Sequence, residues 1–495
     1  MIVGKPITIP EKTEYYSGAY TVNPSTSVQV LSVSGMKMTR NLTIGSAASD
    51  SFDKYVEGRM SSVRNTSASY IASYVFASTR LENVSFEKAS YIGSYAFAFG
   101  SIQRASFPSC VSIYSAAFSS CNRLSEIYMP LVKMIGSHAF NRCWSLSSAN
   151  IPSCERMDEN VFAYCSQLQS VSMPKCSYIG NYAFQSCSRL SYIDAPSCTR
   201  VGSAAFQSCY SLSGLNMPRV TEVYGYGFYN TGIENADLPE LVYGGSYLFG
   251  YCSKLISVDL PNISSIASWA FYNCSSLRTV SAPNCNGVWS AAFYSCYSLE
   301  SFTAPKCTMV SDYAFFNCFA LSMASFDSGI YIGSYAFRSA SALREVTMPS
   351  CEFVGQYAFG ECSSLTSARF PHCSSIGTYA FASCVNLVDV DFTELTYVAG
   401  SAFMRCSSLR TISLPVCSVI SYSAFYSCFA LESLYLMGSS VASLSSTAFY
   451  YTPMSSIGYI GAYGSIFVPE SLYSAYVRAS GWSYYSNRIV SVAEE

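Results

Sequence analysis

The sequence is poor in charged residues. Only 12% of its 495 residues are Asp, Glu, Lys or Arg, and the net charge is −2. An average soluble chain has roughly 25% charged residues. Charges this sparse and this balanced create no basic field for nucleic acid or for an anionic membrane surface. We therefore expect no nucleic-acid partner and an exposed surface made of Ser, Thr, Asn, Gln and Tyr.

Long apolar runs and visible targeting segments are missing as well. No stretch approaches the roughly 20 apolar residues that span a bilayer, so we expect no membrane insertion. The first residues, MIVGKPITIPEKTEYYSG, contain no basic segment followed by an apolar run. No secretory signal peptide is therefore visible.

Side chains that carry catalysis are scarce. His138 and His372 are the two histidines of the chain, and each is a one-off variant of a repeat position. The sequence contains no glycine-rich phosphate loop and no nucleophile paired with a base. We expect no enzyme activity, no catalytic residue, no metal site and no cofactor.

A short phrase recurs through most of the chain instead. Its unit is approximately I-G-x-Y-A-F-x-x-C-x-x-L-x-x-V-x-x-P-x-C, as in residues 179–198. Of the 17 intervals between successive phenylalanines, 13 are 22 residues, three are 21 and the last is 24. The phenylalanines are Phe76, Phe97, Phe118, Phe140, Phe162, Phe184, Phe206, Phe228, Phe249, Phe271, Phe293, Phe315, Phe337, Phe359, Phe381, Phe403, Phe425 and Phe449.

The repeat predicts a solenoid over residues 71–450, with about 18 coils of 22 residues. Its L-x-x-V-x-x-P segment is typical of a short strand that ends at proline. The I-G-x-Y-A-F-x-x-C segment has apolar residues at helix-like spacing, but it is too short for more than a turn or two of irregular helix. One coil cannot bury its Ile, Phe, Leu and Val alone, whereas stacked coils gain roughly 1.5–3 kcal/mol for each such side chain.

The phrase resembles the BspA-like leucine-rich repeat family, whose units carry an I-G-x-x-A-F-x-x-C-x-x-L-x-x-I-x-x-P pattern. The resemblance covers about residues 60–450. It implies an α/β-type repeat solenoid, a right-handed superhelix with one parallel β-sheet face. Proteins of this family are mostly surface or secreted binding proteins of bacteria and some protozoa. The family has no shared catalytic residues.

All 22 cysteines fall into two columns of the repeat, three residues after the phenylalanine or eight residues before it. A catalytic nucleophile would be single, and a zinc site needs close pairs such as C-x-x-C. We favour buried free thiols, with disulfides between stacked coils as the alternative. The predicted core ladder contains Phe118, Phe140, Phe184, Cys121, Cys143 and Cys187.

Two further columns are candidates for ligand binding. The strand position after the Val varies from coil to coil and would point outward, which indicates either a recognition face or an ordinary solvated face. The position two residues before the phenylalanine is rich in Tyr, as a structural ladder or a surface for stacking sugars. The candidate face comprises Tyr128, Asn150, Tyr192, Asp194, Asn216, Asp237, Asp259, Arg369, Asp391 and Tyr435.

Both ends of the chain depart from the repeat. Residues 1–45 predict a small β module for attachment, and 46–70 an irregular N-terminal cap. Residues 17–44 resemble a short module of tail-associated proteins of phages and prophages. Residues 451–495 predict a C-terminal strand-helix-strand cap, with a helix from Glu470 to about Ser480 and Gly481 as its stop.

The leading hypothesis is a non-enzymatic recognition protein of a phage or prophage tail that binds the host bacterial surface. Residues 1–45 would then contact tail or baseplate proteins, and the chain would belong to the virion. The alternative is a bacterial cell-surface or secreted adhesin that binds host protein or glycan. An enzyme on a solenoid scaffold is a third possibility, against which the missing catalytic groups argue.

Overall fold

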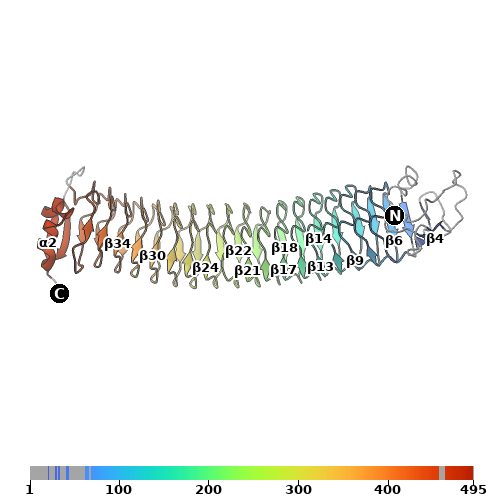
Figure 1. Cartoon of the computed structure of the whole chain (residues 1–495), viewed down its shortest axis with the longest axis horizontal. Coiled ribbons are helices and arrows are strands. Elements are labelled where there is room, and N and C mark those ends of the chain that lie inside the picture. Colours follow the sequence, from blue (N-terminus) through green and yellow to red (C-terminus); the bar gives the residue numbers. More distant parts are fainter. Residues whose placement is uncertain are drawn as a thin grey trace. The chain divides into compact units, whose positions relative to one another are not determined.

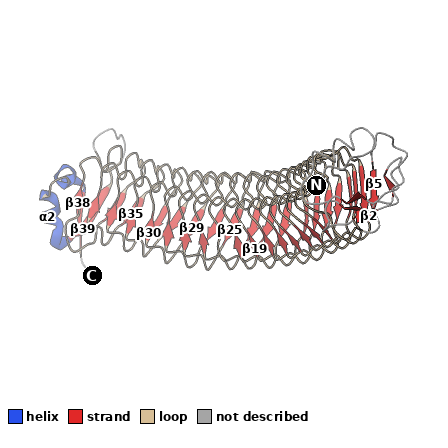
Figure 2. Cartoon of the chain, turned by 45° about the vertical axis from the view of Figure 1, so that its right-hand side comes forward, coloured by secondary structure: helices blue, strands red, loops and turns tan. Residues whose placement is uncertain are grey.

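The computed structural model describes residues 20–21, 28–29, 32–33, 41–43, 62–65, 68–455 and 463–493 (Figure 1). The chain divides into two compact units, residues 1–241 and 242–495, and each is described separately. In both units the predicted solenoid is present as successive coils with parallel strands (Figures 1 and 2). Among the described residues, no helix has the length and apolar character to cross a membrane.

One coil shows how the repeat folds. Strand β15 (Tyr178–Ile179) leads into a series of tight turns at residues 181–186, and the chain then enters β16 (Tyr192–Asp194). Ile179 and Ile193 are completely buried, because alternate side chains of a strand point to opposite sides. Each coil therefore has two strands and one turn segment around an apolar interior.

The longer strands form the expected parallel ladder. Residues 22 positions apart face each other, so that Asp194 pairs with Asn216 and Ile193 with Leu215. In the first unit these strands are β6 (Asn83–Phe86), β8 (Arg104–Ser106), β10 (Glu126–Tyr128), β12 (Ser148–Asn150), β14 (Ser170–Ser172), β16, β18 (Gly214–Asn216) and β20 (Asn235–Asp237). In the second unit they are β22 (Ser257–Asp259), β23 (Thr279–Ser281), β25 (Ser301–Thr303), β27 (Met323–Ser325), β29 (Glu345–Thr347), β31 (Ser367–Arg369), β33 (Asp389–Asp391), β35 (Thr411–Ser413) and β37 (Ser433–Tyr435).

A second parallel ladder, of two-residue strands, accompanies the first and was not predicted. Its pairs, such as Tyr178 with Arg200, are again 22 residues apart. In the first unit it contains β7 (Tyr91–Ile92), β9 (Ser112–Ile113), β11 (Met134–Ile135), β13 (Arg156–Met157), β15, β17 (Arg200–Val201) and β19 (Glu222–Val223). In the second unit it contains β21 (Tyr243–Gly244), β24 (Gly287–Val288), β26 (Met309–Val310), β28 (Tyr331–Ile332), β30 (Phe353–Val354), β32 (Ser375–Ile376), β34 (Tyr397–Val398), β36 (Val419–Ile420) and β38 (Ser443–Leu444).

The irregular helix that the sequence predicted for the I-G-x-Y-A-F-x-x-C segment does not form, and tight turns take its place. Tyr182 and Ser186 have left-handed backbones, with φ of 55° and 58°, and so do the equivalent positions of the other described coils except Thr447 in the last one. Their N–H groups donate to the next coil, at 2.9 Å to the carbonyl of Ser203 and 2.8 Å to that of Gln207. Successive backbone N–H groups of this segment thus donate alternately to a carbonyl of the next coil and to a carbonyl of their own coil. These inter-coil bonds compensate the cost of left-handed residues, about 1–2 kcal/mol each.

Stacked phenylalanines fill the interior. The rings of Phe118 and Phe140 are parallel within 5° at a centroid distance of 5.2 Å, and those of Phe184 and Phe206 within 2° at 5.3 Å. Phe425 and Phe449 continue the same contact at 5.5 Å in the second unit. Each of these rings is fully buried. The predicted phenylalanine ladder is therefore a column of rings, one per coil.

Short strands and a terminal helix lie outside the regular coils. β4 (Asn41–Thr43) pairs with β1 (Tyr20–Thr21) in parallel and with β2 (Val28–Gln29) in antiparallel orientation. β3 (Ser32–Val33) pairs antiparallel with β5 (Ser62–Asn65), which continues in parallel to β6. Most of residues 1–45 and most of the expected cap at 46–70 lie outside the described residues.

The C-terminal segment packs against the last coils of the second unit. It contains β39 (Ser465–Pro469), the short 3₁₀ helix η1 (Glu470–Leu472), α2 (Tyr473–Arg478), a second 3₁₀ helix η2 (Trp482–Arg488) and β40 (Ile489–Val492). The indole of Trp482 is fully buried and donates from Nε1 to the carbonyl of Ala442 at 2.6 Å. The α-helix ends at Arg478, earlier than the sequence indicated. Gly481, with φ of 84°, then redirects the chain, and a Cβ there would lie 2.6 Å from the carbonyl oxygen of Leu444.

Candidate ligand-binding surfaces

The cysteine columns belong to the interior. All 22 thiols are buried and none is in a disulfide. Three residues after the phenylalanine, the thiol donates to the carbonyl of the preceding coil's phenylalanine, as in Cys187 Sγ to Phe162 O at 3.0 Å. Eight residues before it, the thiol bonds within its own coil, as in Cys198 Sγ to Arg200 O at 3.4 Å. Burial raises the pKa of Cys209 to about 12, so this thiol is protonated and unreactive at neutral pH. The cysteines both fill space and satisfy carbonyls.

The described residues contain no cluster of three or more His, Cys, Asp or Glu arranged to hold a metal. His372 Nδ1 lies 3.0 Å from Glu394 Oε1 in an exposed pair on neighbouring coils. His138 is exposed on a turn segment with φ of 62°.

The predicted recognition face of the first unit is the outer side of the longer strands. Tyr192 is 44% exposed and Tyr128 59% exposed, so both rings stand out from their strands. Asp194 is held in place by its neighbours, since Ser172 Oγ donates to its Oδ2 at 3.0 Å and Asn216 Nδ2 to its Oδ1 at 2.7 Å. The outer column is thus a connected polar ladder with aromatic side chains on it. Asn150 on β12, and Asp237 on β20, are the remaining predicted members in this unit, and both are exposed.

The second unit carries the other four candidates. Arg369 bonds from Nη2 to Asp389 Oδ2 at 3.1 Å, an exposed ion pair between adjacent strands. Asp391 accepts from the hydroxyl of Thr393 at 2.9 Å. Tyr435 stacks on the ring of Phe467 in β39, with centroids 4.5 Å apart. Asp259 is exposed at the end of β22 and lies in a different unit from Asp194, with which it was grouped by sequence.

The tyrosine column before the phenylalanines is a stacked ladder where consecutive coils carry Tyr. Centroids are 4.8 Å apart for Tyr313 and Tyr335, and 5.2 Å apart for Tyr335 and Tyr357. The guanidinium of Arg338 lies 5.1 Å from the Tyr357 centroid. Inside such a ladder the ring faces are already covered, and only edges and hydroxyls remain for a ligand. This geometry favours the structural interpretation over stacking of sugars on this column.

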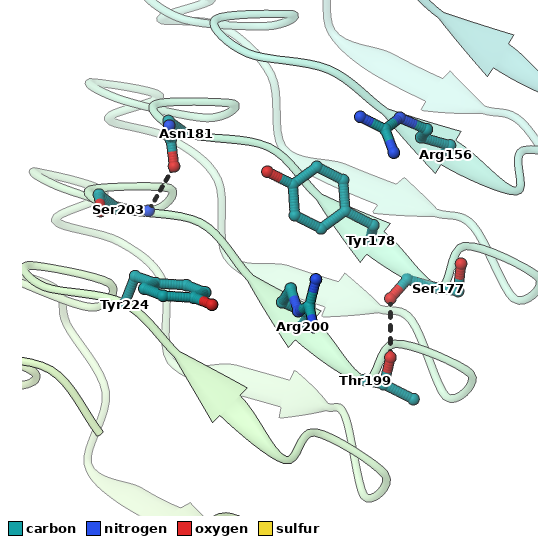
Figure 3. A pocket seen from close by; sticks show the side chains of 8 residues that line it. All are labelled: Arg156, Ser177, Tyr178, Asn181, Thr199, Arg200, Ser203 and Tyr224. Atoms are coloured by element: carbon teal, nitrogen blue, oxygen red, sulfur yellow. Dashed lines mark hydrogen bonds between the residues drawn. The ribbon is translucent and has the colours of Figure 1, made fainter. Parts of the chain in front are cut away.

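A groove that was not predicted lies on the short-strand ladder of the first unit. Its volume is about 680 Å³, within the range of ligand pockets. Figure 3 shows side chains from neighbouring coils along it, with Tyr178 between Arg156 and Arg200. The lining residues are Arg156, Ser177, Tyr178, Asn181, Thr199, Arg200, Ser203 and Tyr224.

Comparison with known families matches the repeat that builds these surfaces. A family model described as "BspA type Leucine rich repeat region (6 copies)" matches residues 50–169, 133–250, 177–299, 245–359 and 330–456. The chain belongs to the BspA-type leucine-rich repeat family. BspA-type proteins are typically found at the cell surface or secreted, and leucine-rich repeat proteins commonly bind proteins or other ligands.

Several solved structures resemble the BspA-type chain. A leucine-rich repeat protein from Bacteroides ovatus is 21% identical, with a TM-score of 0.43, over 63% of this chain and 87% of its own. A leucine-rich cell surface protein from Faecalibacterium prausnitzii is 19% identical, with a TM-score of 0.27, over 82% and 85%. The pneumococcal vaccine antigen PcpA is 14% identical, with a TM-score of 0.32, over 86% and 85%. A search of curated proteins gave no match. Because these TM-scores are low, the family assignment depends on the repeat model.

Sequence reasoning missed the groove of this BspA-type solenoid although a sign of it is present. The repeat position four residues before the phenylalanine is Asp158, Gly180, Gly202 and Tyr224 in four successive coils. Asp158 and Tyr224 thus flank two glycines along the part of the short ladder that carries the groove. That pattern becomes visible only when the coils are aligned on the short ladder.

Proposed function

We propose that this BspA-type chain is a non-enzymatic recognition protein that binds a protein or a surface glycan with the outer side of its longer strands. The observation that carries the proposal is the contrast within one strand. Ile193 is completely buried and is replaced only by other apolar residues in the equivalent strands, whereas the flanking Tyr192 and Asp194 vary in size and charge. Variation on the outward side of a strand whose inward side is uniform is what a recognition surface on a solenoid requires.

The chemistry of this face supports contact with a polar partner. In the first unit it presents exposed aromatic rings at Tyr128 and Tyr192 beside the fixed acceptor Asp194. Tyr is favoured at interfaces because it buries a large area while losing little conformational entropy. A carboxylate held by two hydrogen bonds is already oriented before the partner arrives, which lowers the entropic cost of binding.

A binding panel tests the proposal. The purified full chain is offered to intact bacterial cells, mucin and fibronectin, and binding is measured by flow cytometry and biolayer interferometry. The variant Tyr128→Ser/Tyr192→Ser/Asp194→Ser should bind at least tenfold more weakly, with unchanged circular dichroism. The control Trp144→Ser/Tyr164→Ser/Tyr210→Ser changes equally exposed aromatic residues outside the strands and should bind like the unmodified chain. Loss in the control alone, or no binding to any member of the panel, would contradict the proposal.

Tail association is a second, finer candidate that rests on the resemblance of residues 17–44. None of the comparisons supports it. In this version residues 1–45 attach the chain to a phage or prophage tail. Mass spectrometry of particles from the source strain after prophage induction would detect the chain with purified tails, whereas recovery only in the envelope or medium would favour the adhesin.

Absence of catalysis is part of the same proposal. Incubation of the chain with cell-wall glycans should release no soluble product. A hydrolysis product that scales with protein concentration would instead show an enzyme built on the solenoid.

A further inference from the structure

The groove on the short-strand ladder has walls made of paired charges. At one end Arg156 Nε lies 3.0 Å from Asp158 Oδ1, and at the other Arg200 Nε lies 3.0 Å from Glu222 Oε2. Tyr224 adds a hydroxyl that donates to the same Glu222 oxygen at 3.0 Å. The two guanidinium groups are therefore neutralised by two carboxylates, and the groove has no net charge.

The neighbouring coils approach closely at Gly180 and Gly202, next to the lining residues Asn181 and Ser203. A Cβ on Gly180 would overlap the backbone of Asp158, and one on Gly202 would lie 2.5 Å from the backbone nitrogen of Asn181. Both positions must therefore remain without side chains for the coils to stack. The backbone beside the groove is therefore closely stacked from coil to coil.

The groove presents hydrogen-bond donors and acceptors in fixed positions. Each arginine uses Nε for its carboxylate, and no partner of its terminal nitrogens is present among the described residues. Asn181 accepts the backbone N–H of Ser203 at 2.8 Å, which orients its amide. Thr199 Oγ1 donates to the carbonyl of Ser177 at 3.2 Å and keeps its own lone pairs for a ligand (Figure 3).

An aromatic ring is available beside these groups. The guanidinium of Arg156 lies 5.0 Å from the Tyr178 centroid and covers one face of the ring. No other ring or cation that the structure describes stacks on Tyr178. The exposed part of the Tyr178 ring lines the groove, where it can contact an apolar patch of a ligand, such as the C–H face of a sugar ring.

We propose that this groove binds a neutral oligosaccharide of two or three residues, aligned with the stacking direction of the coils. Sugar hydroxyls both donate and accept, so they match a lining of guanidinium, amide, hydroxyl and carboxylate groups whose charges already cancel. An extended chain of equatorially linked pyranoses advances by a length similar to the coil spacing, which is 5.3 Å between the Phe184 and Phe206 rings. Successive sugars can therefore meet equivalent groups on successive coils. This site lies on a different ladder from the strand face and does not depend on its role.

Titration calorimetry of the full chain tests the proposal with four defined probes: cellotriose, chitotriose, maltotriose and the anionic trigalacturonate. At least one neutral trisaccharide should bind, and Tyr178→Ser should weaken its binding at least tenfold. Serine is compatible with this position because Ser112 and Ser375 occupy it in other coils. The matched control is Tyr397→Ser, which removes an exposed Tyr from the same repeat position in the second unit and should leave binding unchanged.

Each other outcome overturns the saccharide site. The outcomes are binding of trigalacturonate alone, no binding of any probe, equal weakening by both substitutions, or full binding by folded Tyr178→Ser protein. Folding of both variants is checked by thermal unfolding, which should match that of the unmodified chain. Failure here leaves the strand-face proposal standing, since that proposal is tested with Tyr178 intact.

Discussion

The inward and outward columns of the same coils differ in how much they vary. Inside, Phe184 and Cys187 have near-identical counterparts on neighbouring coils, because each ring stacks on the next and each thiol donates to the coil before it. Outside, Tyr192 is followed in the ladder by Gly214, and Asp194 by Asn216. Repetition of the inward columns therefore maintains the stack, and the outward strand columns are free to vary.

Alkaline pH should unfold the coils, because it ionises the buried thiols of the inward columns. Burial raises the pKa of Cys209 to about 12 and that of Cys307 to about 11 from the ordinary value of 9.0. The protonated thiol is thus favoured in the folded state, whereas unfolded thiols ionise from pH 9. The contribution to stability is complete below pH 9 and is lost as the pH rises to 12. We expect thiolate absorbance to appear together with loss of circular dichroism, and an earlier appearance in folded protein would contradict the burial of the thiols.

Among single substitutions, replacing one phenylalanine of the ladder by alanine should lower the stability of the protein most. Phe206→Ala leaves a cavity between two stacked rings and should cost about 3–5 kcal/mol. Tyr210→Ala in the same coil changes a side chain that is 54% exposed and should cost less than about 0.5 kcal/mol. Urea unfolding monitored by hydrogen exchange of the adjacent coils measures both, and equal shifts would show that the ladder is not the core.

Adding a side chain at a glycine where two coils approach closely should cause an intermediate loss of stability. A Cβ on Gly355 would lie 2.6 Å from the backbone of Gly333 and Ser334, so Gly355→Ala should destabilise by about 1–3 kcal/mol. Gly287→Ala is the matched control in the same unit, because the nearest atom to its Cβ would be 3.9 Å away. Unfolding midpoints should separate the two variants. A neutral Gly355→Ala would mean that the coils can move apart without cost.

Replacing a buried cysteine should cost less stability than the glycine substitution, and the cost should differ between the two cysteine columns. Cys187→Ala removes a bond of 3.0 Å between coils, and Cys198→Ala one of 3.4 Å within a coil. A buried hydrogen bond contributes roughly 0.5–1.5 kcal/mol, and the shorter bond should be nearer the upper value. Urea unfolding of both variants, each replacing a fully buried thiol, checks the order. The reverse order would show that thiol packing matters more than the bonds.

Much of the solenoid could be predicted because its buried columns repeat. Phe118 and Phe140 are at one step of the period and Cys121 and Cys143 at another, all four are buried, and the family model matches the same residues. The strand ladder follows from the proline and the apolar spacing. The helix-like spacing of the I-G-x-Y-A-F segment was misleading, because hydrogen bonds to the next coil replace those within a helix.

The left-handed residues and the groove depend on contacts that one repeat does not contain. Two residues after the phenylalanine, the left-handed position is occupied by Ser186, Tyr164 and Arg142 in different coils, so no residue type indicates it. The groove is formed by side chains of successive coils, such as Arg156, Tyr178 and Arg200, which are 22 residues apart in the sequence. The candidate residues of the strand face remain a prediction, since their exposure is known but their partner is not.

Photo-crosslinking would test the central claim most directly, that recognition occurs on the outward strand columns. Benzoylphenylalanine replaces Tyr192, which is 44% exposed on a strand, or Tyr210, which is 54% exposed outside the strands. Each chain is irradiated on the cells or matrix protein that the unmodified chain binds. The account predicts a crosslinked product from position 192 and none from position 210. Products from position 210 alone, or in equal yield from both, would contradict it.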